Sequence, residues 1–229
     1  MRRRLIGAAA VLAASCSAAG AAAGPAASPA RLMSSALAAA HAQRSVHYVT
    51  TATIRGVRIG IVGDAGVDRG RQRITYRQTG GAGRVTVIVV ANTAYIHGDA
   101  FTLVHYMGLP AALAAARAGK WILVPHTSSA FKTVAAAARL GSAVDELKMP
   151  LPLESAGTAT VRGQRATGIR SRFSRFGYDV TETLYVRAAG SPLPVEQVGH
   201  GANIAFSDVF GDWNEPVDVA APAGAVPLP

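Results

Sequence analysis

The chain has 229 residues, of which half are hydrophobic and 16% are charged, and its formal net charge is +10 at pH 7. A single cysteine, Cys16, excludes an internal disulfide framework, so the fold must be held by its core alone. About 190 residues lie beyond the N-terminal segments described next, which is enough for one domain with a substantial core.

The first sixteen residues have the pattern of an export signal. Three arginines follow Met1, and residues 5–14 are a short run of apolar and small side chains. About ten such residues are too few to span a bilayer, where roughly twenty are needed, so the run is predicted to be a signal peptide. It ends in Leu12-Ala-Ala-Ser-Cys16, which resembles a bacterial lipobox. We therefore expect residues 1–16 to be a lipoprotein signal with Cys16 acylated. The alternative is cleavage in the small-residue run 18–27, which leaves no anchor.

Composition divides the remaining chain into a tether, a domain and a tail. Residues 17–29 are almost all Ala, Gly, Ser and Pro, which have little to bury, so they are predicted to be a disordered tether. Residues 30–222 carry the periodic patterns of folded elements and are predicted to be one domain. Residues 223–229 are predicted to be a tail.

Outside the signal the net charge falls from +10 to +7, because three of the cations are Arg2, Arg3 and Arg4. Most of the other cations are arginines scattered over predicted strands and turns. Three interpretations are open: a solvated outer face of a sheet, contact with anionic lipid head groups, or nucleic-acid binding. Since the arginines are not interleaved with aromatic residues, as in single-strand binders, we expect no nucleic-acid partner.

The domain is predicted to begin with one helix and three strands. Residues 30–42 follow Ser28 and Pro29, a cap and a first-turn proline, and carry one apolar stripe, so they form an amphipathic helix that should lie on a sheet. Strands are predicted at residues 45–54, 57–62 and 71–76. In the first of them, alternation places five residues on one face: Val46, Tyr48, Thr50, Ala52 and Ile54.

The stretch from Arg84 to His97 is predicted to be a β-hairpin turning at Asn92 and Thr93. Both faces of its first strand are apolar, so we expect material packed on both. Such a sheet is typical of a shell around an apolar cavity. The two faces are Val85, Val87 and Val89 on one side and Thr86, Ile88 and Val90 on the other.

A helical insert and a second run of strands follow. Residues 99–107, 110–118 and 128–140 are predicted helices, with a strand at 120–124 and a helical turn within 142–149. From residue 154 the pattern returns to short strands at hairpin spacing, which favours antiparallel pairing. No βαβ alternation is found. The predicted strands are 158–161, 165–173, 178–187, 193–198 and 203–206.

Signals for catalysis and metal binding are weak or missing. The chain has no nucleophile elbow, phosphate-binding glycine loop or dinucleotide fingerprint. His97 and Asp99 flank Gly98, but no predicted helix carries two histidines three or four residues apart. The glutamates at 154, 182 and 196 lie on different strands and do not form a glycosidase pair. We therefore expect no enzyme activity, no catalytic residue, no metal and no cofactor.

The apolar side chains of the insert leave two interpretations open. The helices either fill the concave side of the sheet as an ordinary core, or they line a hydrophobic cavity of the kind that holds lipid chains. In the second case we expect the lining to come from the hairpin, the insert and the strand after it. The predicted lining residues are Val85, Val87, Val89, Leu103, Val104, Met107, Leu113, Ala114, Ile122 and Val134.

Several of these features occur together in one known group. The lipobox, the N-terminal helix, residues 87–98, Gly119-Lys-Trp-Ile122 and the closing stretch 206–222 resemble, in this order, the actinobacterial envelope lipoproteins of the LppX/LprG type. That group is similar to the LolA-like carriers. The likeness covers residues 30–222. Gly119, Lys120 and Trp121 match a structural landmark, and Cys16 matches the acylated position.

The resemblance implies an α+β fold: a strongly bent antiparallel sheet, or half-barrel, with an N-terminal helix and a central helical insert on its concave face. It implies a membrane-tethered, non-enzymatic protein that binds or carries lipid or lipoglycan acyl chains at the outer face of the cell membrane. A protein partner in the envelope is possible. The alternative is a structural or sensory envelope domain that binds another protein and has no open lipid cavity.

Overall fold

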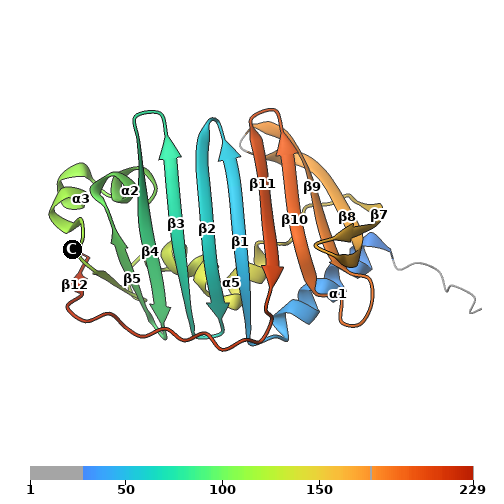
Figure 1. Cartoon of the computed structure of the whole chain (residues 1–229), viewed down its shortest axis with the longest axis horizontal. Coiled ribbons are helices and arrows are strands. Elements are labelled where there is room, and N and C mark those ends of the chain that lie inside the picture. Colours follow the sequence, from blue (N-terminus) through green and yellow to red (C-terminus); the bar gives the residue numbers. More distant parts are fainter. Residues whose placement is uncertain (1–27, 176, 229) are drawn as a thin grey trace, which may run out of the picture.

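A computed structural model describes residues 28–175 and 177–228. Twelve strands form one curled, unclosed sheet in the order β12-β6-β5-β4-β3-β2-β1-β11-β10-β9-β8-β7. All neighbours pair antiparallel except β12 and β6 (Figure 1). The strands are β1 (Ser45–Ile54), β2 (Val57–Gly66), β3 (Arg69–Gln78), β4 (Gly81–Val90), β5 (Thr93–Gly98), β6 (Ile122–Pro125), β7 (Leu153–Val161), β8 (Gln164–Arg175), β9 (Tyr178–Arg187), β10 (Pro194–Gly201), β11 (Ile204–Gly211) and β12 (Val226–Pro227).

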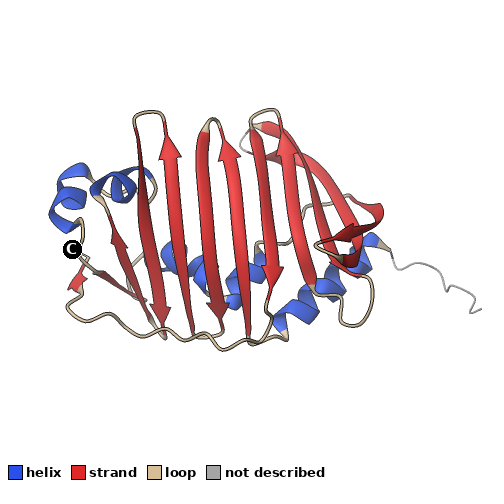
Figure 2. Cartoon of the chain, in the orientation of Figure 1, coloured by secondary structure: helices blue, strands red, loops and turns tan. Residues whose placement is uncertain are grey.

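The helices all lie on one side of this sheet, behind it in Figure 2. They are α1 (Pro29–His41), α2 (Ala100–His105), α3 (Ala111–Arg117), α4 (Phe131–Ala135), the 3₁₀ helix η1 (Ala136–Ala138) and α5 (Leu140–Asp145). The predicted fold class, a bent antiparallel sheet with an N-terminal helix and a helical insert on its concave face, is confirmed.

The sheet consists of two meanders joined in the middle. Strands β1 to β6 follow one another along the chain, and so do β7 to β11. The join is the pairing of β1 with β11, which runs from His47 opposite Gly211 to Ile54 opposite Ile204. The middle of the sheet is therefore made by opposite ends of the domain.

The predicted hairpin is confirmed as β4 and β5, with Val85 opposite Gly98 and Val90 opposite Thr93. Its turn is made by Ala91 and Asn92, one residue earlier than expected, and Ala91 has a φ of 48°. The inward valines Val85, Val87 and Val89 are buried, whereas Thr86, Ile88 and Val90 on the outer face are only half-buried. Only one face of this hairpin is thus fully packed.

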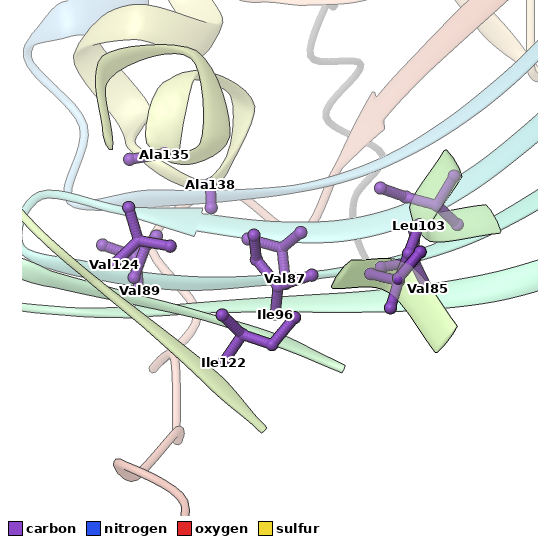
Figure 3. Packing of buried hydrophobic residues seen from close by; sticks show 12 residues of the cluster. Val85, Val87, Val89, Ile96, Leu103, Ile122, Val124, Ala135 and Ala138 are labelled. Atoms are coloured by element: carbon purple, nitrogen blue, oxygen red, sulfur yellow. The ribbon is translucent and has the colours of Figure 1, made fainter. Parts of the chain in front are cut away.

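The largest core cluster lies between this hairpin and the helical insert (Figure 3). Val87, Ile96 and Ile122 project from three adjacent strands, Leu103 covers one end from α2, and Ala135 and Ala138 approach from the other side. A second cluster packs α1 on β8 and β9 through Met33, Ile169 and Leu184, as the amphipathic stripe predicted.

Two local details differ from the sequence-based prediction. The single helix expected from residue 128 to 140 is divided into α4 and η1, and Arg139 is extended before α5, which overlaps the helical turn expected within 142–149. Residues 226 and 227, within the expected tail, form strand β12 on the free edge of β6, and Leu228 donates its backbone N–H to the carbonyl of Leu123.

Candidate functional site

A hollow of about 400 Å³ lies on the inner side of the sheet, under η1 and α5. It spans the join between the two meanders, because its walls come from β1 and β2 on one side and β9 to β11 on the other. Pockets for small molecules and cofactors commonly have volumes of about 300–1,000 Å³, so the space suits a ligand. Its apolar lining is Ala52, Ile54, Ile59, Ile61, Tyr106, Ala137, Ala143, Leu147, Ile204, Phe206 and Phe210.

Small residues determine how closely the helical cover, which is formed by η1 and α5, approaches the sheet. At Gly70 of β3 the contact is very close, since a Cβ there would lie 1.9 Å from the carbonyl oxygen of Ala138. Over β1 and β11 the cover presents Ala137 and Ala143, whose short side chains line the hollow. The hollow is the space that these short side chains leave.

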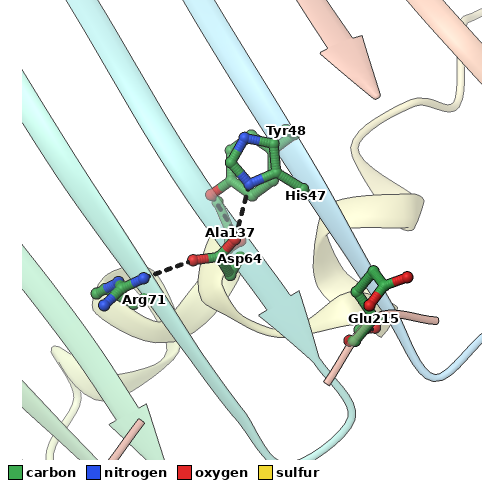
Figure 4. A network of polar contacts seen from close by, with 7 residues as sticks. His47, Tyr48, Asp64, Arg71, Ala137 and Glu215 are labelled. Atoms are coloured by element: carbon green, nitrogen blue, oxygen red, sulfur yellow. Dashed lines mark hydrogen bonds and ion pairs between the residues drawn. The ribbon is translucent and has the colours of Figure 1, made fainter. Parts of the chain in front are cut away.

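Tyr48 connects the floor of the hollow to its cover. Its hydroxyl donates a hydrogen bond to the carbonyl oxygen of Ala137 at 2.8 Å (Figure 4). The same hydroxyl accepts a hydrogen bond from Nε2 of the buried Gln72 at 2.5 Å. Burial raises the pKa of Tyr48 above its ordinary value, despite the opposing hydrogen bond from Gln72. The tyrosine therefore stays neutral and acts as a fixed support.

Acidic and amide side chains line one part of the hollow. Glu146, Glu182 and Asp208 are all among its lining residues, together with Gln197. Glu182 and Gln197 are each only 3% exposed, and Thr50 donates its hydroxyl proton to Asp208 at 2.5 Å. The hollow is therefore mainly apolar, with a polar wall that can accept hydrogen bonds but offers no cationic side chain.

The ten residues predicted to line a cavity lie elsewhere. Val85, Val87, Val89, Leu103, Ala114 and Ile122 are buried members of the cluster under the insert, and Val104, Met107 and Val134 pack against that cluster. Leu113 is half-buried on α3. None of the ten is a lining residue of the 400 Å³ hollow. Ile59, Ile61 and Tyr106 pack against the buried cluster and also line the hollow, so they form the border between the two.

Residues that raised the question of metal binding have structural roles. Asp99 caps α2 by accepting from the backbone N–H of Thr102 at 2.8 Å, and it also accepts from the backbone N–H of Arg84. Partial burial would raise the pKa of this carboxyl, but these hydrogen bonds outweigh it and hold the pKa below its usual range. Within residues 28–175 and 177–228, no group of three His, Asp or Glu side chains could hold a metal ion.

The landmark Gly119-Lys-Trp121 directly precedes β6 and contacts the end of β5. Gly119 has a φ of 71°, which favours glycine, and its backbone N–H donates to the carbonyl of Gly98 at 2.9 Å. The Trp121 ring lies 5.0 Å from the ring of His97, and its carbonyl accepts the backbone N–H of Val226. The motif thus holds the sheet edge and the C-terminal strand together.

Cys16, the predicted acylation site, lies outside the described residues, as do the remainder of the signal and most of the tether. Among the described helices, none is long and apolar enough to cross a membrane.

By sequence, no family model and no curated protein matches the chain. By structure, it is similar to LprF from Mycobacterium bovis, with a TM-score of 0.56 and 14% identity over 86% of this chain and 97% of that one. It is also similar to the Mycobacterium tuberculosis lipoprotein LppX, with a TM-score of 0.52 and 16% identity over 82% of this chain and 98% of that one. The chain therefore has the same fold as LprF and LppX.

Within this fold, the sequence contained one signal for the hollow under η1 and α5. The alternating face of β1 predicted from residues 45–54 supplies Tyr48, Thr50, Ala52 and Ile54 to it. The contributions of β11, including Phe206 and Phe210, were not predicted, because the expected strand ended at residue 206 and its partner was unknown.

Proposed function

We propose that this protein is a non-enzymatic binder or carrier of lipid or lipoglycan acyl chains, held at the outer face of the cell membrane through an acylated Cys16. The observation that carries the proposal is the inner hollow, which lies between the mainly apolar inner face of the sheet and a helical cover. Each methylene buried there contributes about 0.8 kcal/mol, so an acyl chain can bind well with few polar contacts. The LppX/LprG-type fold supports the same assignment.

We place the acyl chain first in the hollow bordered by Ile61, Phe206 and Phe210. From there the space would extend toward the ten residues that the sequence predicts to line a cavity. They begin directly beyond Ile59, Ile61 and Tyr106, and a longer chain reaches them when the short helices α2, α3 and α4 move apart. Short helices joined by loops are suited to such opening, since each has few contacts of its own.

Native mass spectrometry with lipid extraction tests this function. The purified protein is expected to carry lipid, and Ala143→Phe, which fills the hollow, should reduce the lipid-bound fraction at least tenfold without unfolding the sheet. Ala116→Phe, on the exposed side of α3, is the matched control. Purified protein without lipid that also fails to bind added lipid would favour the alternative, an envelope domain that binds another protein.

The membrane anchor is tested separately. Mass spectrometry of the mature N-terminus should find an acylated Cys16 as the first residue. An unmodified N-terminus within residues 18–27 would show that the signal is cut downstream, and the proposed tethering would then be wrong.

A further inference from the structure

A second hollow, of about 900 Å³, lies on the opposite, outer face of the sheet. Its lining residues form three successive rows across β11, β1, β2, β3 and β4. The middle row is Phe206, Ala52, Ile59, Tyr76 and Gly83, and the side chains of the first four point inward. The two flanking rows point outward, so the hollow is a groove that crosses five strands over their backbone.

The registers of the strands place three arginines along this groove. One flanking row is Ala205, Thr53, Arg58, Arg77 and Ala82, and the other is Ser207, Thr51, Gly60, Thr75 and Arg84. The three arginines are exposed, and no carboxylate lines the groove. Gly60 keeps its middle open, because a Cβ there would lie 2.7 Å from the hydroxyl of Thr75.

Arg58 and Arg77 are directly opposite one another on adjacent strands. Like charges in this position destabilise a sheet, whereas an opposite charge would stabilise it. None of the ion pairs among residues 28–175 and 177–228 includes Arg58, Arg77 or Arg84. Neighbouring Arg71 and Arg69, by contrast, have Asp64 and Asp68 as partners. An anion from outside the chain would neutralise the positive charge of these three arginines.

We propose that this groove docks the protein on an anionic bilayer by binding the phosphate groups of lipid head groups. The groove is open and long, and exposed Arg73 extends its positive field along β3, so it suits a plane of phosphates better than one enclosed anion. Its ten outward residues include no aromatic side chain on which a nucleic-acid base could stack.

The groove and the inner hollow lie back to back. Ala52, Ile59 and Phe206 line both, with their backbone facing the groove and their side chains facing the hollow. Docking through the groove would hold the inner hollow one sheet thickness from the head groups. This inference does not depend on the inner hollow binding lipid, because it concerns the other face of the sheet.

The test is co-sedimentation with vesicles of phosphatidylcholine, with or without phosphatidylglycerol, at 0.1 M salt. The full chain carries Cys16→Ser in every arm, so that acylation does not contribute. The variant Arg58→Gln/Arg77→Gln/Arg84→Gln is compared with Arg31→Gln/Arg44→Gln/Arg165→Gln, which removes the same charge from exposed positions outside the groove. Each arginine near an anionic surface contributes about a fivefold gain in binding, so the groove variant should bind about a hundredfold more weakly.

The control variant should keep most of its binding, and wild-type binding should fall when salt is raised to 0.5 M. An equal loss in both variants would overturn the proposal, because net charge alone would then explain binding. So would competition by glycerol 3-phosphate at an affinity equal to that for vesicles, which would indicate a soluble ligand. Loss of oligonucleotide binding in the groove variant with unchanged vesicle binding would also overturn it.

Discussion

The hydroxyl of Tyr48 on β1 donates a hydrogen bond to the carbonyl oxygen of Ala137 on η1, 89 residues along the chain. The Tyr48 side chain and this bond together span the distance from the sheet floor of the inner hollow to its helical cover. Because Gln72 donates to the same hydroxyl, the tyrosine is held in one orientation. The height of the hollow is therefore set by a hydrogen-bonded side chain as well as by apolar packing.

Replacing Tyr48 with phenylalanine should destabilise the protein by about 1–3 kcal/mol, because it leaves the buried amide of Gln72 and the carbonyl of Ala137 without this partner. Urea unfolding followed by circular dichroism measures the loss. Tyr95→Phe is the control, since Tyr95 lies half-buried on the outer face of β5. Equal stability of Tyr48→Phe and wild type would show that η1 is held by other contacts.

Two glycine-to-alanine changes near the helical cover should have opposite effects. At Gly70 the new Cβ would meet the backbone oxygens of Ala138 and Asp64 at 1.9 and 2.6 Å, so Gly70→Ala should destabilise by about 1–3 kcal/mol and push η1 away from the sheet. At Gly141 in α5 nothing lies within 4 Å, so Gly141→Ala should stabilise by about 0.5–1 kcal/mol. Chemical denaturation of both variants decides the matter; a stabilised Gly70→Ala would contradict the close contact.

Stability should fall in acid partly through Asp64. Burial would raise the pKa of this carboxyl, but hydrogen bonds from His47 and Arg71 outweigh it and hold the pKa below 3.8 (Figure 4). The folded state therefore favours the carboxylate more than the unfolded state does. This contribution is complete above the unfolded pKa and is lost as the pH falls through the folded value, below about pH 4.

Asp64→Asn should thus lower stability by about 1 kcal/mol at pH 5 and by progressively less toward pH 2, where the two proteins converge. Thermal unfolding at half-unit pH intervals measures the difference. Asp179→Asn, an exposed aspartate on β9, is the comparison. A constant difference across the range would mean that the charge of Asp64 is not what stabilises the fold.

The polar wall of the hollow should select ligands by charge. An ionised fatty acid would place its carboxylate near Glu146, Glu182 or Asp208, so we expect it to bind about tenfold or more weakly than its uncharged methyl ester. Displacement of a fluorescent lipid probe measures both affinities. Glu182→Gln should narrow the gap, and Glu154→Gln on exposed β7 should leave it unchanged. Tighter binding of the acid would contradict this role of the wall.

Local patterns in the sequence predicted most of the strands and helices, since alternation and caps depend on neighbouring residues. The hairpin of β4 and β5 and the helix α1 are examples. The pairing of β1 with β11 could not be predicted in this way, because residues that meet across it, such as Thr50 and Asp208, are 158 residues apart. The strand β12 was missed for another reason: two residues beside a proline-rich segment carry no periodic signal.

The hollow illustrates a different limit. Large apolar side chains such as Leu103 and Ile122, which the sequence predicts to line a cavity, also fill space well, and both are completely buried. The open volume lies where Ala137 and Ala143 face a wall that includes Glu182. Apolar periodicity identifies the residues that avoid water, whereas a void depends on side-chain lengths across a contact that only the fold defines.

The central join between β1 and β11 has a consequence for how the protein is made. During synthesis, strands β1 to β6 can pair in order, but β1 keeps an open edge until β11 follows more than a hundred residues later. Unpaired strand edges are templates for aggregation. Chains that end before β11 should therefore self-associate, and this nascent state is the one with the greatest need for a chaperone.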